Sequence, residues 1–409
     1  MFHNETVFVL GAGASWHYGY PTGEGLVESV ISMANRFATY CKHRLESGDV
    51  SQAIPKYVQQ KIVRESLEGQ SLAWKAVQQE CVTLAERLQT VRPLVIDYFL
   101  AWNKSLQPIG TLMIASSILE CEAIWSRQQT NQNRLLAIKN QLRRPDAVEL
   151  RYYDISKCKD DWCRFIVHKL VYGCSASSDL LQNKVSFITF NYDTSLEFRL
   201  MRSLKSIDLL NEQDVDTFFN DDRVIHVYGA VHSGVPTETD FIDANVAATL
   251  VQGFSRPPNP TADFVPKMQF LDRCLEASKT LLTIDPHTKE NELARLALAK
   301  AAIAKSEVLY ILGYGFDENN NKRVGLDPSL RRGPTSTRSV MFTNYLDNNI
   351  INKRASKLCF GRADQFMVSP VHGEPMEGGF FEKSVRDVYE ALELDFDSLE
   401  SELTAGLSV

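Results

Sequence analysis

Glycines and residues with amide, carboxylate or imidazole side chains gather in five short motifs, each next to an apolar run. The motifs are Gly11-Ala-Gly-Ala-Ser15, Thr189-Phe-Asn-Tyr-Asp193, Ile225-His-Val-Tyr-Gly-Ala-Val-His232, Gly313-Tyr-Gly-Phe-Asp317 and Phe342-Thr-Asn344. Glycines allow a backbone to turn tightly and to approach a pyrophosphate, and a helix after such a turn favours anions. Histidine exchanges a proton near pH 7. Together these residue types favour nucleotide binding with proton transfer beside it.

Each motif taken alone has a simpler interpretation. Gly11 and Gly13 can form a tight turn without a ligand, and as a dehydrogenase fingerprint they are incomplete because Trp16 stands at the third glycine position. No acidic residue ends a second strand about 20 residues further on. Asn191 and Asp193 can be turn residues that bond their own backbone. The sequence contains no P-loop motif, which excludes that class of kinase and ATPase.

Apolar, β-branched runs predict the strands that position these motifs. The runs are residues 6–10, 184–190, 223–228, 308–312 and 339–343. Strands that alternate with helices favour an α/β fold, here a Rossmann-like, mostly parallel, doubly wound sheet. In such sheets ligands bind beyond the carboxyl ends of the strands, where the five motifs fall.

Long helical patterns interrupt the α/β pattern after the first strand. They cover residues 57–67, 73–88, 94–102, 109–125, 135–142 and 161–172. We therefore expect a single nucleotide-binding domain over residues 1–409, whose core segments are 5–30, 183–235 and 305–390. A large helical insertion would occupy residues 35–180, and a second insertion of loops and helix residues 236–304.

Composition narrows the class of protein. The 409 residues are 44% hydrophobic, enough for a sizeable core, and the net charge of −7 makes direct nucleic-acid binding unfavourable. No apolar run reaches the roughly 18 residues that span a membrane, and we expect no secretory signal and a cytoplasmic location. The eight cysteines form no C-x-x-C pair, so we expect no structural zinc.

The order of the motifs resembles that of the sirtuin family. Gly11–Ser15, followed by Gly19-Tyr-Pro21-Thr22, is similar to the sirtuin opening. Thr189–Asp193 resembles the sirtuin T-x-N-x-D motif, and Gly313–Asp317 resembles the G-x-S nucleotide loop. The resemblance leaves the helical insertion unexplained.

Two departures indicate a branch of that family. Protein-deacylating sirtuins carry a zinc module with paired cysteines, whereas residues 230–312 contain only Cys274. The form Phe190-Asn-Tyr-Asp193 is typical of bacterial sirtuin-like effectors that degrade NAD in anti-phage defence. This resemblance implies an NAD+ glycohydrolase that cleaves the nicotinamide–ribose bond to give nicotinamide and ADP-ribose. It also implies a homo-oligomer, no catalytic metal, and in some members a HerA-type ATPase as partner.

The resemblance assigns roles to individual residues. Asn191 would hold the ribose and orient a water, Asp193 would grip the nicotinamide carboxamide, and Asn344 would contact the adenosine ribose. Two turns would cradle phosphates and adenosine through Gly11, Ala12, Gly13, Ser15, Pro21, Thr22, Gly313 and Gly315.

The sequence does not decide which residue transfers the proton. Tyr228 occupies the place where sirtuins have the histidine of a His-Gly pair, and we count it among the residues that contact NAD. Side chains alternate faces along the predicted strand 223–228, so His226 shares the face of Tyr228 one step deeper. His232 lies nearer the ligand edge, and we favour it as the base. The competing functions are an NAD or ADP-ribose sensor without catalysis, a protein deacylase, and a helical scaffold with a vestigial α/β part.

Overall fold

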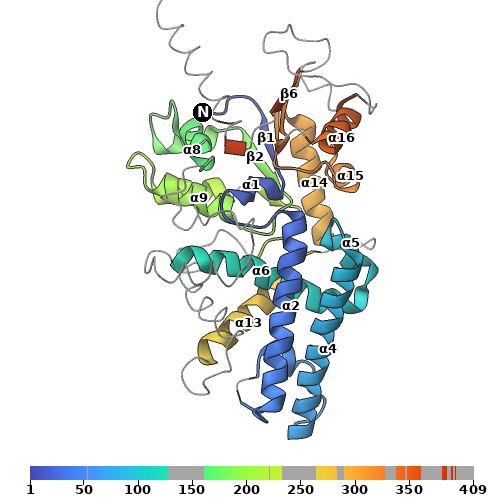
Figure 1. Cartoon of the computed structure of the whole chain (residues 1–409). Coiled ribbons are helices and arrows are strands. Elements are labelled where there is room, and N and C mark those ends of the chain that lie inside the picture. The colour runs from blue at the N-terminus through green and yellow to red at the C-terminus, as the bar shows by residue number, and fades with distance from the viewer. Residues whose placement is uncertain are drawn as a thin grey trace, which may run out of the picture.

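The computed structural model describes residues 1–52, 54–127, 161–220, 222–232, 264–282, 290–327, 338–345, 348–360, 380–384, 388–389 and 392. Its strands form one sheet (Figure 1). They are β1 (Thr6–Leu10), β2 (Val185–Thr189), β3 (Val224–His226), β4 (Val308–Leu312), β5 (Ser339–Thr343) and β6 (Phe380–Ser384).

All the pairings in this sheet are parallel, in the order β3-β2-β1-β4-β5-β6. This is the strand order of dinucleotide-binding Rossmann sheets. The chain moves outward from β1 to β3, crosses back to β4, and moves outward again on the other side. The predicted Rossmann-like, mostly parallel α/β fold is confirmed.

The sheet is anchored on β1, whose residues are all buried. Phe8 stacks on Phe187 of β2, with ring centroids 5.2 Å apart, and on Tyr310 of β4 at 4.7 Å. These three residues also face one another in the strand register. A strand that is buried on both faces has a nearly continuous apolar sequence. The pattern of residues 6–10 therefore predicts β1 well.

Helices flank the sheet on two sides (Figure 1). The first group is α8 (Cys163–Val171), α9 (Ser195–Lys205) and α10 (Glu212–Asn220), and the second is α14 (Glu290–Lys305), α15 (Glu318–Val324) and α16 (Asn349–Phe360). Right-handed crossovers that leave the centre in opposite directions require helices on opposite faces. The turn η3 (Ser177–Gln182) precedes β2, and a short helix α1 (Ala12–Trp16) follows β1.

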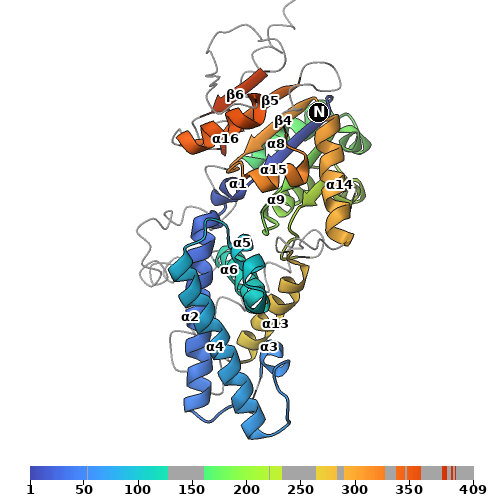
Figure 2. The ribbon, with the colours of Figure 1, turned by 90° about the vertical axis from the view of Figure 1, so that its right-hand side faces the viewer.

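The remaining helices form a separate layer that extends away from the sheet edge (Figure 2). We call it the helical unit. It consists of α2 (Gly23–Glu46), α3 (Lys56–Gln59), α4 (Leu67–Val91), α5 (Ile96–Trp102), η1 (Lys104–Leu106), α6 (Gln107–Arg127) and α13 (Phe264–Thr280). The expected helix over residues 57–67 is reduced to α3, and the one over residues 135–142 lies outside the described residues.

The boundaries expected for the two insertions differ from those that the packing of the helices indicates. α2 runs without a break through residues 30–35, so core and insertion share one helix. α8 packs against α9, and Trp162 Nε1 donates to the Ala14 carbonyl (2.8 Å), so residues 162–171 belong to the α/β unit and not to the expected insertion over residues 35–180. Of the second insertion, α13 packs on α6, whereas α14 packs on α15 and β3. α14 is therefore the crossover helix into β4.

Candidate functional site

Two glycine turns meet where the strand order reverses, between β1 and β4. The Gly11 N–H donates to the Leu312 carbonyl (3.0 Å), and the Gly13 N–H donates to the Gly313 carbonyl (2.9 Å). Ligands of open α/β sheets bind at such a reversal. The fold therefore places the first and fourth motifs together at the carboxyl edge.

The glycines at these turns are required by backbone contact. A Cβ on Gly11 would lie 2.5 Å from the Gly313 oxygen, and a Cβ on Gly13 would lie 2.8 Å from the Gly313 Cα. Gly313 has φ of +59°, in the left-handed region that favours glycine. A Cβ on Gly315, in contrast, would meet nothing within 4 Å. Close packing of two turns thus explains Gly11, Gly13 and Gly313, whereas the structure leaves room for a Cβ at Gly315.

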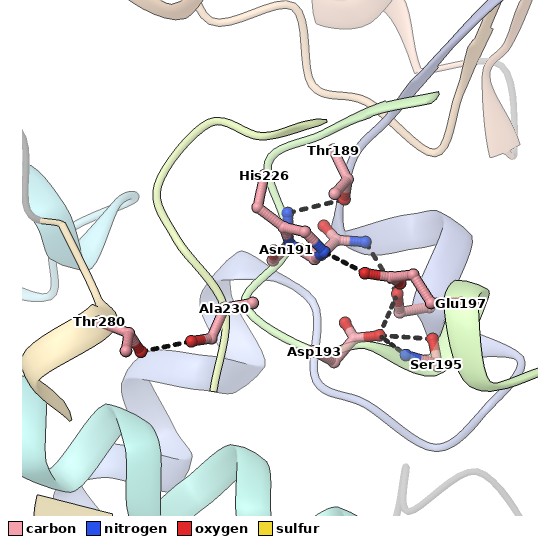
Figure 3. A network of polar contacts seen from close by, with 9 residues as sticks. Thr189, Asn191, Asp193, Ser195, Glu197, His226, Ala230 and Thr280 are labelled. Carbon is pink, nitrogen blue, oxygen red and sulfur yellow. Dashed lines mark hydrogen bonds and ion pairs between the residues drawn. The ribbon is translucent and has the colours of Figure 1, made fainter. Parts of the chain in front are cut away.

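A buried hydrogen-bond network joins the first motif to the second. Asn191 Nδ2 donates to the Gly11 carbonyl (3.0 Å) and to Ser15 Oγ (2.8 Å). Ser15 Oγ donates in turn to Asp193 Oδ1 (3.1 Å), which also accepts from Ser195 Oγ and from the Ser195 N–H (3.1 Å). Figure 3 shows Asn191, Asp193 and Ser195 of this network. Three of the residues singled out in the sequence, Ser15, Asn191 and Asp193, therefore lie in one cluster.

The carboxyl group of Asp193 is shielded from water. Burial raises the pKa of Asp193 to about 6, although hydrogen bonds from Ser195 and Ser15 favour the ionised form, and the charge of Glu197 acts in the same direction as burial. At neutral pH Asp193 is therefore mostly an anion with few water contacts. Such an anion interacts strongly with any positive charge that develops beside it.

His226 belongs to the same cluster through a carboxylate that the sequence did not single out. Its Nε2 lies 2.5 Å from Glu197 Oε1, and its Nδ1 lies 3.0 Å from the Asn191 carbonyl oxygen (Figure 3). Both side chains are largely buried, 12% and 7% exposed for His226 and Glu197. Because both ring nitrogens face acceptors, the arrangement suits a doubly protonated, charged imidazole.

The pKa of His226 follows from two opposed effects. Burial lowers it, but the charge of Glu197 and the hydrogen bonds to Glu197 and to the Asn191 carbonyl raise it above its ordinary value overall. A ring that already donates from both nitrogens has no lone pair with which to accept another proton. In this conformation His226 supports Asn191 and is not free to act as a base.

Tyr228 does not share a strand face with His226, contrary to the expectation from residues 223–228. β3 ends at His226, because the chain turns there and Gly229 takes φ of +77° with its N–H directed to the His226 carbonyl (3.3 Å). The Tyr228 hydroxyl donates to Asn320 Oδ1 of α15. Its ring lies 6.0 Å from that of Phe190.

His232 lies next to the loop that follows β2. The preceding residue, Val231, donates its N–H to the Tyr192 carbonyl (2.9 Å), in the middle of the Asn191–Asp193 segment. His232 itself is half-buried. The chain therefore carries His232 to the neighbourhood of Asn191 by a backbone contact.

Other residues expected at the site lie outside the hydrogen-bond network of Ser15, Asn191 and Asp193. Asn344 Nδ2 donates to the Asn348 carbonyl (3.0 Å) and to Asn352 Oδ1 (2.6 Å), and its Oδ1 accepts from the Asn348 N–H (3.1 Å), so its amide organises the start of α16. Thr22 is the exposed residue that precedes α2, next to Pro21. Ala12 opens α1 behind the Gly11 turn. None of these positions makes a described hydrogen bond to Ser15, Asn191 or Asp193.

Sequence reasoning missed two acids, Glu197 and Asp97. Glu197 stands only four residues after Asp193, in the first turn of α9, so this short separation along the chain could have indicated that both acids lie near the end of β2. Asp97 of α5 accepts a hydrogen bond from the Tyr192 hydroxyl, a contact between residues that are 95 positions apart. No local pattern could have indicated that second contact.

Comparisons with known proteins add no assignment: no protein family, no curated protein and no solved structure matches this chain. Among the described residues, no three histidine, cysteine, aspartate or glutamate side chains gather as metal ligands would. Within that same part of the chain, none of the helices is both long enough and apolar enough to cross a membrane.

The glycine contact predicts a difference between two alanine variants. Gly11→Ala forces a Cβ against the Gly313 backbone, so we expect it to lower the free energy of unfolding by about 1–3 kcal/mol. Gly315→Ala meets open space and should change it far less. Urea unfolding of both variants measures the difference, and equal stabilities would show that the two turns are not in contact.

The ion pair of His226 and Glu197 predicts a pH-dependent stability. Because the folded pKa of His226 is raised, the pair stabilises fully below the unfolded histidine pKa of about 6.5 and loses this effect as pH rises through the folded pKa. Glu197→Gln should therefore lower the free energy of unfolding more at pH 6 than at pH 9.

Glu46→Gln is the matched control, since Glu46 lies 3.9 Å from His43 in an exposed pair on α2. We expect little effect from it at either pH. An equal loss at pH 6 and pH 9 for Glu197→Gln would refute a charged His226.

Proposed function

We propose that this protein is an NAD+ glycohydrolase, which cleaves the nicotinamide–ribose bond and releases nicotinamide and ADP-ribose. One observation carries the proposal: the Ser15–Asn191–Asp193 network lies beside two glycine turns, at the reversal point of a sheet with dinucleotide-binding strand order. The resemblance of the motifs to sirtuin-like NAD-degrading effectors supports the same reaction. NAD is the substrate, and the residues that we assign need no metal.

In this proposal Asn191 orients the attacking water. Both hydrogens of its amide are used inside the protein, toward Gly11 and Ser15, which holds the side chain in one orientation. The side-chain oxygen of Asn191, Oδ1, is then the group that accepts a hydrogen bond from water or from a ribose hydroxyl. A fixed acceptor avoids the entropic cost of ordering the water during the reaction.

The carboxylate of Asp193 stabilises the positive charge that develops on the ribose. Nicotinamide leaves as a neutral molecule, and the ribose becomes oxocarbenium-like and positive. Asp193, buried and mostly ionised at neutral pH, favours that charge. One oxygen of Asp193 is held by Ser15 and Ser195, and the other would accept a hydrogen bond from the nicotinamide carboxamide.

His232 is the group that we assign to proton transfer. Both ring nitrogens of His226 face acceptors, Glu197 and the backbone carbonyl of Asn191, whereas the chain brings His232 to the same loop from the turn after Gly229. A base must reach the water or a ribose hydroxyl within hydrogen-bond distance. The half-buried position of His232 allows such an approach when NAD is bound.

A sensor that binds NAD or ADP-ribose without cleaving it is the second candidate. Tyr228, at the position of the sirtuin His-Gly histidine, is buried and its hydroxyl is bonded to Asn320, so this side chain acts as a structural support. A role in anti-phage defence, a homo-oligomeric state and an ATPase partner belong to the proposal through the family resemblance. Product analysis separates the enzyme from the sensor.

Asn191→Ala tests the proposed reaction. The variant removes the oriented acceptor, so we expect NAD cleavage to be lost while the fold stays intact. Asn183→Ala is the matched control, since Asn183 is also a buried asparagine with structural hydrogen bonds, placed before the opposite end of β2. Nicotinamide release per folded molecule is the measurement. Wild-type turnover by a well-folded Asn191→Ala protein would remove Asn191 from the mechanism.

The two histidines are expected to respond differently. His232→Ala should reduce NAD cleavage by roughly 10²- to 10⁴-fold, the usual effect of losing a positioned acid–base group, with little change in melting temperature. His226→Ala should lower the melting temperature, because it leaves buried Glu197 without its partner. The reverse pattern would assign the base to His226, and loss of activity in Tyr228→Phe alone would assign it to the tyrosine.

A further inference from the structure

Two adjacent residues of α5 reach from the helical unit to two different loops of the site. The Tyr192 hydroxyl donates to Asp97 Oδ1, and the Tyr98 hydroxyl donates to Asp317 Oδ1 at 2.7 Å. Tyr192 stands between Asn191 and Asp193 after β2, and Asp317 ends the motif after β4. One helix therefore bridges the loops on either side of the Gly11 turn.

The first of these contacts is fully buried. Asp97 is 7% exposed and Tyr192 is 6% exposed. A buried carboxylate that loses its hydrogen-bond donor stays without water, so the contact resists displacement of either partner. Tyr192 cannot move away from α5 without this penalty, and Asn191 and Asp193 are its covalent neighbours.

The second contact continues into α15. Asp317 Oδ1 also accepts from the N–H groups of Asn319 (3.1 Å) and Asn320 (3.0 Å), and it thereby caps that helix. Asn320 accepts from the hydroxyl of Tyr228, after β3. Hydrogen bonds thus connect α5 to the loops after β2, β3 and β4.

We propose that Asp97 and Tyr98 are positioning residues of the NAD site, through which the helical unit determines where Asn191 and Asp193 lie. This inference rests on the proposed function, and it gives the helical unit a part in the reaction. A displacement of about 1 Å at a reacting group can cost roughly 100-fold in rate, so a contact of this kind matters for catalysis without touching NAD.

The test uses variants that remove one hydrogen bond and keep the packing. Tyr192→Phe and Tyr98→Phe each remove a hydroxyl, and Asp97→Ala removes the acceptor. Asp97→Asn keeps an acceptor oxygen and should behave like the wild type. Tyr57→Phe is the matched control, since the Tyr57 hydroxyl donates to Glu80 (2.9 Å) within the helical unit, between α3 and α4.

Two readouts are compared in the full-length variants. Hydrogen exchange of residues 190–195 reports on how firmly the loop is held and does not depend on NAD turnover. We expect several-fold faster exchange in Tyr192→Phe and Asp97→Ala, and unchanged exchange in Asp97→Asn and Tyr57→Phe. Steady-state kinetics should show kcat lowered roughly 10- to 100-fold in Tyr192→Phe, Asp97→Ala and Tyr98→Phe, with a smaller change in KM.

Unchanged exchange in Tyr192→Phe would overturn the inference, and so would faster exchange with an unchanged kcat. A loss of activity in Tyr57→Phe as large as in Tyr192→Phe would also overturn it, because general destabilisation would then explain both. If the wild-type protein leaves NAD intact, the proposed function fails, and the exchange measurement still decides whether α5 holds the loop.

Discussion

The contact between the turns after β1 and β4 is the constraint on which the rest of the site depends. Gly13 donates to the Gly313 carbonyl at a distance that leaves no room for a Cβ on Gly11, Gly13 or Gly313. This close approach brings the two central loops of the sheet together where the strand order reverses. Asn191 then bonds the Gly11 carbonyl, and Thr343 Oγ1 accepts from the Gly313 N–H (2.8 Å), so neighbouring strand ends are arranged around the same backbone contact.

Several carboxylates around this contact are buried. Asp193 and Glu197 near the strand ends, and Asp97 on α5, have little access to water, and each is paired with a tyrosine, a serine or a histidine. Burial raises the pKa of both Asp97 and Asp193 to about 6. A site built in this way has fixed dipoles and charges before any ligand arrives, which is the condition under which electrostatic stabilisation of a transition state is effective.

The strands and the glycine turns could be predicted from the sequence because their signals are local. Thr6–Leu10 is a continuous run since both faces of β1 are buried, and β4 and β5, although less completely buried, also follow apolar runs. The partners of individual side chains could not be predicted. The sequence pattern predicts Tyr228 on the face of His226, but a turn at Gly229 directs its hydroxyl to Asn320 of α15. Asp97 meets Tyr192 only because the helical unit packs against the sheet edge, which no spacing along the chain encodes.

The most direct test of the account is the fate of NAD in the presence of the purified wild-type chain. An NAD+ glycohydrolase releases nicotinamide and ADP-ribose in equal amounts, and this is the result that we predict. NAD that binds and is recovered intact, in a protein whose fold is verified, would contradict the account. The network of Ser15, Asn191 and Asp193 would then belong to a binding site without catalysis.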